Sequence, residues 1–173
     1  FIVLVGIGIH TIRVERTQEY NDLVEEQEEY RESGDFEKEE ETFEEAVRIR
    51  PSSLESYYQN ACALYEQGEY QDCISFIEYN VEQNEKIDLM QPRMAALYYL
   101  EAESHMELED YGDAVTTFEK LFQVGGFEEE YYRDYAIALA YNGEPDQAQD
   151  ALDQAIDLDR KSTRLNSSHL EQS

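Results

Sequence analysis

Histidine, cysteine and carboxylate side chains are the groups in this sequence that could carry out catalysis or hold a metal ion. The three histidines are His10, His105 and His169, which are far apart in the chain. His105 lies in a helical pattern, so we interpret it as a packed or surface residue and not as a general base. The chain has no His-Glu-x-x-His, Gly-x-Ser-x-Gly or phosphate-loop motif. The sequence therefore predicts no catalytic residue, no metal site and no cofactor, and we do not expect an enzyme.

The cysteines and the carboxylates support the same interpretation. Cys62 and Cys73 are too few for a disulfide framework and form no Cys-x-x-Cys motif, so we expect two partly buried thiols without a disulfide. The chain has 41 Asp and Glu against 13 Lys and Arg, a net charge of −28. Carboxylates do not act as an acid pair unless a pocket shifts their pKa values. Such a negative charge repels phosphate backbones and anionic lipid head groups, so we expect no nucleic-acid partner and no adsorption to a lipid surface.

A short turn signature recurs through the middle of the chain. It reads Gly34-Asp35-Phe36, then Gly68-Glu69-Tyr70, then Glu109-Asp110-Tyr111, with Gly143-Glu144-Pro145 at the next expected place. The intervals between successive copies are 34, 41 and 34 residues. Apolar residues at three- and four-residue steps flank each turn, which predicts two antiparallel helices per unit.

The period and the residues around the turns resemble the tetratricopeptide repeat (TPR) family over about residues 20–159. The family places an aromatic residue or Leu early in the first helix of a repeat, and the corresponding residues here are Leu23, Tyr57, Tyr98 and Tyr132. It also places small residues four positions later and after the turn, where this chain has Ala61, Ala102, Ala136, Cys73, Ala114 and Ala148. In the first repeat, Gln27 and Glu39 depart from these two small positions.

The resemblance implies an all-α fold, with helix-turn-helix repeats stacked in a right-handed superhelix of about four repeats. We expect these repeats at about residues 20–53, 54–94, 95–128 and 129–159, within a domain over 18–159. The longer middle interval holds seven extra residues. We interpret these as an extended second helix of repeat two plus a loop that ends at Pro92.

The two ends of the chain differ in composition from the repeats. Residues 1–9 are apolar and Arg13 is the first charged residue. We expect a truncated transmembrane helix and juxtamembrane segment over 1–17, which predicts a membrane-anchored, single-span protein of unknown orientation; the alternative is an amphipathic or buried core helix. The serine-rich segment 160–173 resembles a translated sequencing adapter, and we expect a non-native tail there.

The resemblance also implies the function of a non-catalytic scaffold that binds a protein or peptide in a concave groove. Because the surface is acidic, we expect a basic or neutral ligand segment. The family pattern predicts a groove lined by Tyr58, Cys62, Tyr65, Tyr99, Glu103, Met106, Arg133, Ile137 and Tyr141. Alternatively, these tyrosines pack between neighbouring helices.

Two further interpretations remain open from the sequence. Single-span bacterial Ser/Thr kinases can carry TPR repeats after the membrane helix, so the chain could be the sensor or docking region of such a kinase. It could also be a cell-envelope assembly factor with the same anchor. In every case we expect weak self-association through the exposed face of the last helix.

Overall fold

The computed structural model describes the backbone of residues 2–170 and the side chains of residues 14–162. Eight α-helices and one π-helical segment make up the secondary structure of this part of the chain, and it contains no strand. The predicted all-α fold is confirmed. The chain divides into two compact units, with the boundary between Leu89 and Met90.

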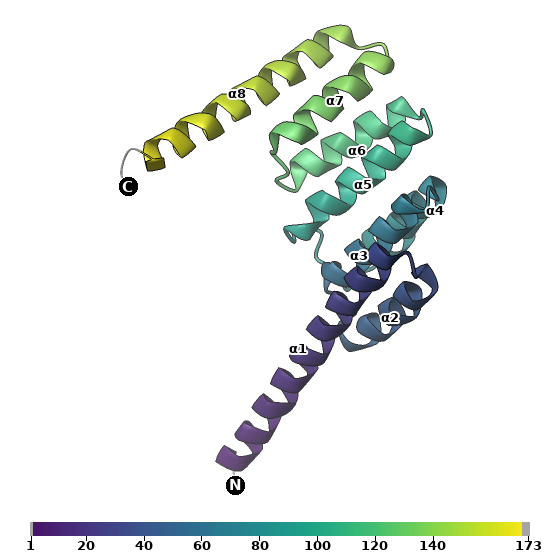
Figure 1. Ribbon diagram of the computed structural model, residues 1–173, viewed down its shortest axis with the longest axis vertical. Helices are drawn as coiled ribbons and strands as arrows, with labels where there is room; N and C mark the ends of the chain where they lie inside the picture. The colour runs from purple at the N-terminus through teal and green to yellow at the C-terminus, as the bar shows by residue number, and fades with distance from the viewer. Residues whose placement is uncertain (1, 171–173) are drawn as a thin grey trace. The chain divides into compact units, whose positions relative to one another are not determined.

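The first unit consists of two successive helix pairs. Its elements are α1 (Ile2–Ser33), α2 (Phe36–Ile49), α3 (Leu54–Glu66), α4 (Tyr70–Phe76) and the π-helical η1 (Ile77–Glu82). α1 packs along α2, and α3 packs against both of them and against α4. The N-terminal part of α1 extends past the end of α2 (Figure 1).

The second unit repeats the same arrangement. Its elements are α5 (Arg93–Glu107), α6 (Tyr111–Gln123), α7 (Glu129–Tyr141) and α8 (Pro145–Leu170). Each helix packs on the next one in the chain. α8 is twice as long as α7, with 26 residues against 13, so its C-terminal half extends beyond its partner (Figure 1).

The turns within the helix pairs share one hydrogen-bond pattern. At Gly68, whose φ is +76°, the N–H donates to Tyr65 O over 2.9 Å, and the following Glu69 N–H donates to Leu64 O over 3.0 Å. This is the Schellman motif, in which a residue in the left-handed region satisfies the last carbonyl groups of a helix. Glu109 occupies the same position in the second unit with φ +61°, as the one non-glycine residue with positive φ in the described chain.

Aromatic and small side chains fill the core of each unit. In the first unit the Phe43 ring lies 5.5 Å from Tyr57 and 5.4 Å from Phe76, both in edge-on geometry. In the second unit Phe118 is fully buried, as are the small side chains of Ala102 and Ala114. A small residue on each helix lets the two backbones approach closely, which leaves the larger aromatic rings to fill the space between pairs.

The seven extra residues of the middle interval form a loop and do not extend a helix. α4 and η1 together end at Glu82, so the second helix of this pair is no longer than its counterpart α6. The Asn84 side chain accepts a hydrogen bond from the Lys86 N–H over 3.1 Å, which turns the chain away from the helix axis. Ile87, only 8% exposed, fixes the loop to the first unit. The predicted helix extension is therefore wrong, whereas the loop ending at Pro92 is present.

The predicted membrane anchoring is also corrected. In the part of the chain that the structure describes, no helix is both long enough and apolar enough to cross a bilayer. Within α1 the apolar residues are followed in the same helix by Arg13, Glu15 and Arg16. The side chains of residues 1–13 themselves lie outside the described residues.

Candidate functional site

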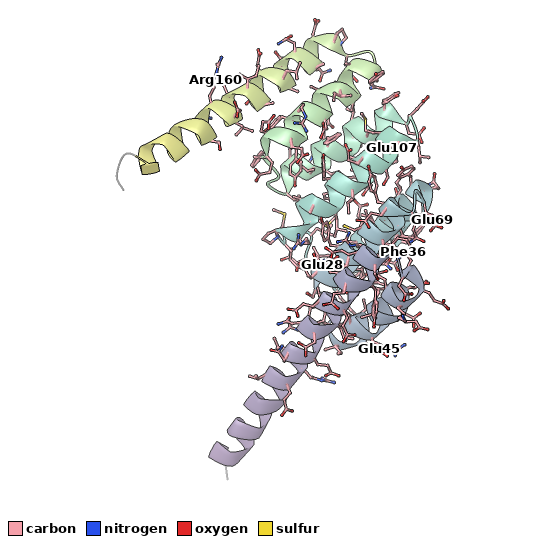
Figure 2. The ribbon with its side chains drawn as sticks, viewed as in Figure 1. Glu28, Phe36, Glu45, Glu69, Glu107 and Arg160 are labelled. Atoms are coloured by element: carbon pink, nitrogen blue, oxygen red, sulfur yellow. The ribbon has the colours of Figure 1, made fainter. Side chains whose placement is uncertain are left out.

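A groove of about 370 Å³ lies on the second unit between α5 and α7. Spacings of three or four residues place Glu103, Met106 and Glu107 on one side of α5, and the same spacings place Asp134, Ile137 and Tyr141 on one side of α7. The turn between α5 and α6 completes the groove with Glu109 and Tyr111. Figure 2 labels Glu107 near the end of α5. Four of the nine predicted groove residues thus line one cavity, namely Glu103, Met106, Ile137 and Tyr141.

Two tyrosine rings form one wall of this groove. Tyr111 and Tyr141 are stacked, with ring centroids 4.8 Å apart and an interplanar angle of 16°. Tyr141 is nevertheless 67% exposed. An exposed ring held against a second ring is a rigid surface on which a guanidinium or ammonium group can stack.

Carboxylates give the groove its charge. Burial raises the pKa of Glu103 to about 7, and repulsion from the carboxylates of Asp134 and Glu107 adds to the effect. Arg133 acts in the opposite direction but does not outweigh it. Several negative charges around one half-buried carboxyl group create a site where a cation would be electrostatically stabilised.

Tyr99 does not line the groove itself but is hydrogen-bonded to Asp134, which does. Its hydroxyl donates a hydrogen bond to Asp134 Oδ2 over 2.7 Å, and its ring lies 4.7 Å from that of Tyr131. Burial and the nearby carboxylates raise the pKa of Tyr99 well above its usual value, so the hydroxyl stays protonated and keeps donating. Tyr99 therefore packs between α5 and α7 and orients the carboxylate that faces the groove.

Arg133 is the basic residue at the edge of this acidic site. Its guanidinium lies 3.8 Å from Glu129, 3.5 Å from Glu130 and 3.4 Å from Asp134. The side chain is exposed, so each of these ion pairs is weak. Arg133 therefore pairs with Asp134, a carboxylate with which a basic ligand would otherwise form an ion pair.

The remaining predicted groove residues lie on α3, in the first unit. Tyr58 and Tyr65 are half-buried, and Cys62 is buried with 8% exposure. The Tyr65 ring makes an edge-on contact with Tyr70 across the turn, at 5.3 Å between centroids. These three residues lie on α3 of the first unit and are not among the residues that line the cavity of the second unit.

Four residues that complete the groove were not predicted from the sequence: Glu107, Glu109, Tyr111 and Asp134. Glu109 and Tyr111 belong to the recurrent turn signature, which we interpreted only as a turn. Their position in the lining follows from the packing of α6 against α5, which spacing along one helix does not reveal. Among the described residues, no group of His, Cys, Asp and Glu side chains could hold a metal ion.

Comparisons with known proteins bear on the fold. The tetratricopeptide repeat family model matches residues 28–53 and 95–124, one segment in each unit. No curated protein matches the chain. Among solved structures, a crystal structure of MamA superposes with a TM-score of 0.68 at 19% identity, covering 84% of this chain and 81% of that one.

Two further structures show the same fold. MamA from Desulfovibrio magneticus RS-1 superposes with a TM-score of 0.63 at 16% identity, covering 82% of this chain and 76% of that one. TTC0263, a thermophilic TPR protein of Thermus thermophilus, superposes with a TM-score of 0.59 at 17% identity, covering 80% of this chain and 74% of that one. The matched repeat segments, the observed helix pairs and these structural neighbours all indicate the same fold. Two segments of the chain are thus similar to the tetratricopeptide repeat, and the chain has the helix-pair fold of tetratricopeptide repeat proteins.

Proposed function

We propose that the chain is a non-catalytic scaffold that binds a basic segment of a protein partner in the groove between α5 and α7. The observation that carries the proposal is the half-buried carboxyl group of Glu103 among the carboxylates of Glu107 and Asp134. These groups repel one another in the free protein. A lysine or arginine side chain in the groove would replace that repulsion with attraction.

The other lining residues suit the same ligand. Met106 and Ile137 offer apolar contact for the methylene groups of a long basic side chain, and Ile137 is 40% exposed. The exposed ring of Tyr141 provides a stacking surface for the charged end. Arginine fits better than lysine, because its planar guanidinium can stack on the ring and pair with a carboxylate at once.

The other predicted groove residues do not line this groove, and they contribute to binding less directly. Tyr99 positions Asp134 through its hydrogen bond. Arg133 competes with the ligand for Asp134. Tyr58 and Tyr65 of the first unit are retained as contacts for other parts of the partner, since both are half-buried and not fully packed. Cys62 is buried, so we assign it no contact of its own.

Binding of a synthetic arginine-rich peptide to the whole chain tests the proposal. In isothermal titration, the double variant Glu107→Gln with Tyr141→Ala is expected to weaken binding about tenfold. The matched control is Asp150→Asn with Phe127→Ala, which removes one exposed carboxylate and one exposed ring outside the groove. Equal weakening in both variants would show that the peptide responds to net charge alone, and the proposal would fail.

We also propose weak self-association through α8. Leu152 and Ile156 are four residues apart on this helix and are 38% and 46% exposed. Two such faces could bury each other, although the negative charge of each chain keeps the association weak. Sedimentation analysis at high concentration should show dimers that disappear in Leu152→Lys with Ile156→Lys. A monomer at every concentration would exclude this contact.

The kinase-linked and cell-envelope alternatives both required the membrane anchor that is corrected above. No contact in the described chain favours either of them. The proposal therefore concerns the repeat scaffold and its protein partner.

A further inference from the structure

A second groove, larger than the first, lies on the first unit. Its volume is about 700 Å³, and it is lined by α2, by α3 and by the segment formed by α4 and η1. Phe36 begins α2 and Glu69 directly precedes α4, and both belong to its lining (Figure 2). It lies along the second helices of the two pairs, and α3 contributes Asn60, Ala63 and Leu64 to its lining.

Aromatic side chains form the apolar part of this groove. The rings of Phe43 and Phe76 meet edge-on at 5.4 Å, and each is only half-buried. Tyr79, one helical turn after Phe76, is 66% exposed. Incompletely buried rings within a concave surface provide the kind of contact on which an apolar side chain of a partner gains affinity.

Acidic side chains stand on both sides of these rings. The exposed ones are Glu37, Glu40 and Glu44 on α2 and Glu69 and Asp72 at the start of α4, and the buried Glu39 also belongs to the lining. Glu44 forms an ion pair with Arg48 at 3.2 Å.

The other four exposed carboxylates, Glu37, Glu40, Glu69 and Asp72, take part in no ion pair within the described part of the chain. No lysine or arginine is among the residues that line the groove. The negative charge on both sides of the apolar surface is thus left for a ligand to neutralise.

We propose that this groove binds a segment of a partner protein in which an apolar side chain is flanked by lysine or arginine residues. The apolar side chain would contact Phe43 and Phe76. The flanking cations would pair with Glu40 on one side and Asp72 on the other. This charge pattern disfavours a second copy of the same chain, with its net charge of −28, as the occupant, and it disfavours a nucleic acid.

The proposal does not depend on the groove of the second unit. The two sites lie on different units and share no lining residue. They also differ in chemistry, because the first-unit groove has phenylalanine rings at its centre and carboxylates at its sides. The groove of the second unit has carboxylates at its centre.

The test uses the whole chain and a fluorescein-labelled peptide of lysines and glycines with two phenylalanines. The double variant Glu40→Lys with Asp72→Lys is expected to weaken binding at least tenfold, measured by fluorescence anisotropy at about 0.15 M salt. The matched control is Glu25→Lys with Glu29→Lys, which changes two exposed acids of α1 that do not line the groove. We expect the control to weaken binding less than about twofold. Circular dichroism checks that both variants keep their helices.

Two further measurements separate this site from nonspecific charge attraction. The Tyr79→Ala variant keeps every charge, and it should weaken binding about threefold because it removes exposed apolar area. A peptide with benzophenone in place of one phenylalanine should cross-link to residues of α2 or of the α4 and η1 segment. Equal weakening in the groove variant and the control, or cross-links only to α5 and α7, would overturn the proposal.

Discussion

Gln27 and Glu39 are hydrogen-bonded to each other inside the first unit. Gln27 Nε2 donates to Glu39 Oε1 over 2.8 Å, and the two side chains are 0% and 1% exposed. Asn60 Nδ2 donates to the other carboxylate oxygen over 3.1 Å, and Ser56 Oγ donates to Gln27 Oε1 over 2.5 Å. Gln27 and Glu39 are the two residues of the first repeat that stand where the other repeats have small side chains. Each departure therefore supplies the hydrogen-bond partner that the other needs.

Removing Gln27 and Glu39 together should cost less stability than the sum of the two single removals. Gln27→Ala leaves a buried carboxylate with one donor fewer, and we expect a loss of about 2–3 kcal/mol in the free energy of unfolding. In the double variant with Glu39→Ala, the second substitution should cost at least about 1 kcal/mol less than it does alone. Urea denaturation of all four proteins measures this coupling. Glu39→Ala combined with Thr117→Ala of the second unit is the control pair, and its effects should add.

The stability of the protein should depend on the protonation of Glu103. The folded protein holds the pKa of this carboxyl group at about 7, above its usual value of 4.5. Below pH 4.5 both the folded and the unfolded chain are protonated there, and the contribution to stability is complete. Between these values the folded chain binds more protons than the unfolded chain, so stability falls as the pH rises through about 7.

Thermal denaturation at a series of pH values checks this dependence. We expect the wild-type protein to lose about 1–2 kcal/mol relative to Glu103→Gln between pH 5 and pH 8, after allowance for partial exposure. Glu85→Gln removes an exposed carboxylate from the loop of the first unit and should follow the wild-type curve. Parallel curves for the wild type and Glu103→Gln would contradict the assignment.

Replacing Glu109 with glycine should stabilise the second unit. The residue has φ +61° in a turn whose counterparts in the other helix pairs are Gly34, Gly68 and Gly143. A side chain in the left-handed region costs about 1 kcal/mol, which glycine avoids. We expect a gain of about 1 kcal/mol, or a few degrees in Tm. Gly68→Ala is the reciprocal test: a Cβ atom there meets no neighbour, so any loss of stability comes from the backbone conformation.

Removing Arg133 should strengthen the binding of a basic peptide in the second-unit groove. The guanidinium neutralises part of the charge of Asp134, which lines the groove, and of the neighbouring Glu130, and its loss leaves Asp134 to the ligand. We expect Arg133→Gln to bind an arginine-rich peptide about threefold more tightly at low salt, with the difference shrinking as salt is added. Arg160→Gln makes the same change in net charge on α8, away from the groove, and should leave the affinity nearly unchanged. Weaker binding by Arg133→Gln would mean that the arginine itself contacts the ligand.

The helix pairs were predictable because their signals are local. The turn residues fix where each pair reverses, and the three- and four-residue spacing of apolar residues fixes which face is buried. The interpretation of the middle insertion was less successful. Helical spacing up to Val81 gives no sign that the helix ends at Glu82, because that end depends on the hydrogen bonds of Asn84 with Lys86 and Tyr57.

The predicted membrane anchor failed for a different reason. Local hydropathy identifies an apolar run, but a span requires that the run continue through a whole helix. The charged residues from Arg13 onward lie within the same α1 helix, and no helix of the described chain has the length and the hydropathy of a span.

The sequence by itself determined the helical repeat, its turns and the strongly acidic charge, because each of these depends on neighbours a few residues apart. Only the tertiary structure decided which side chains meet across helices. It brought Gln27 to Glu39, stacked Tyr111 on Tyr141, and surrounded Glu103 with carboxylates from α5 and α7. Such contacts depend on how far and at what angle one helix packs on the next, and side-chain spacing within a single helix does not contain that information.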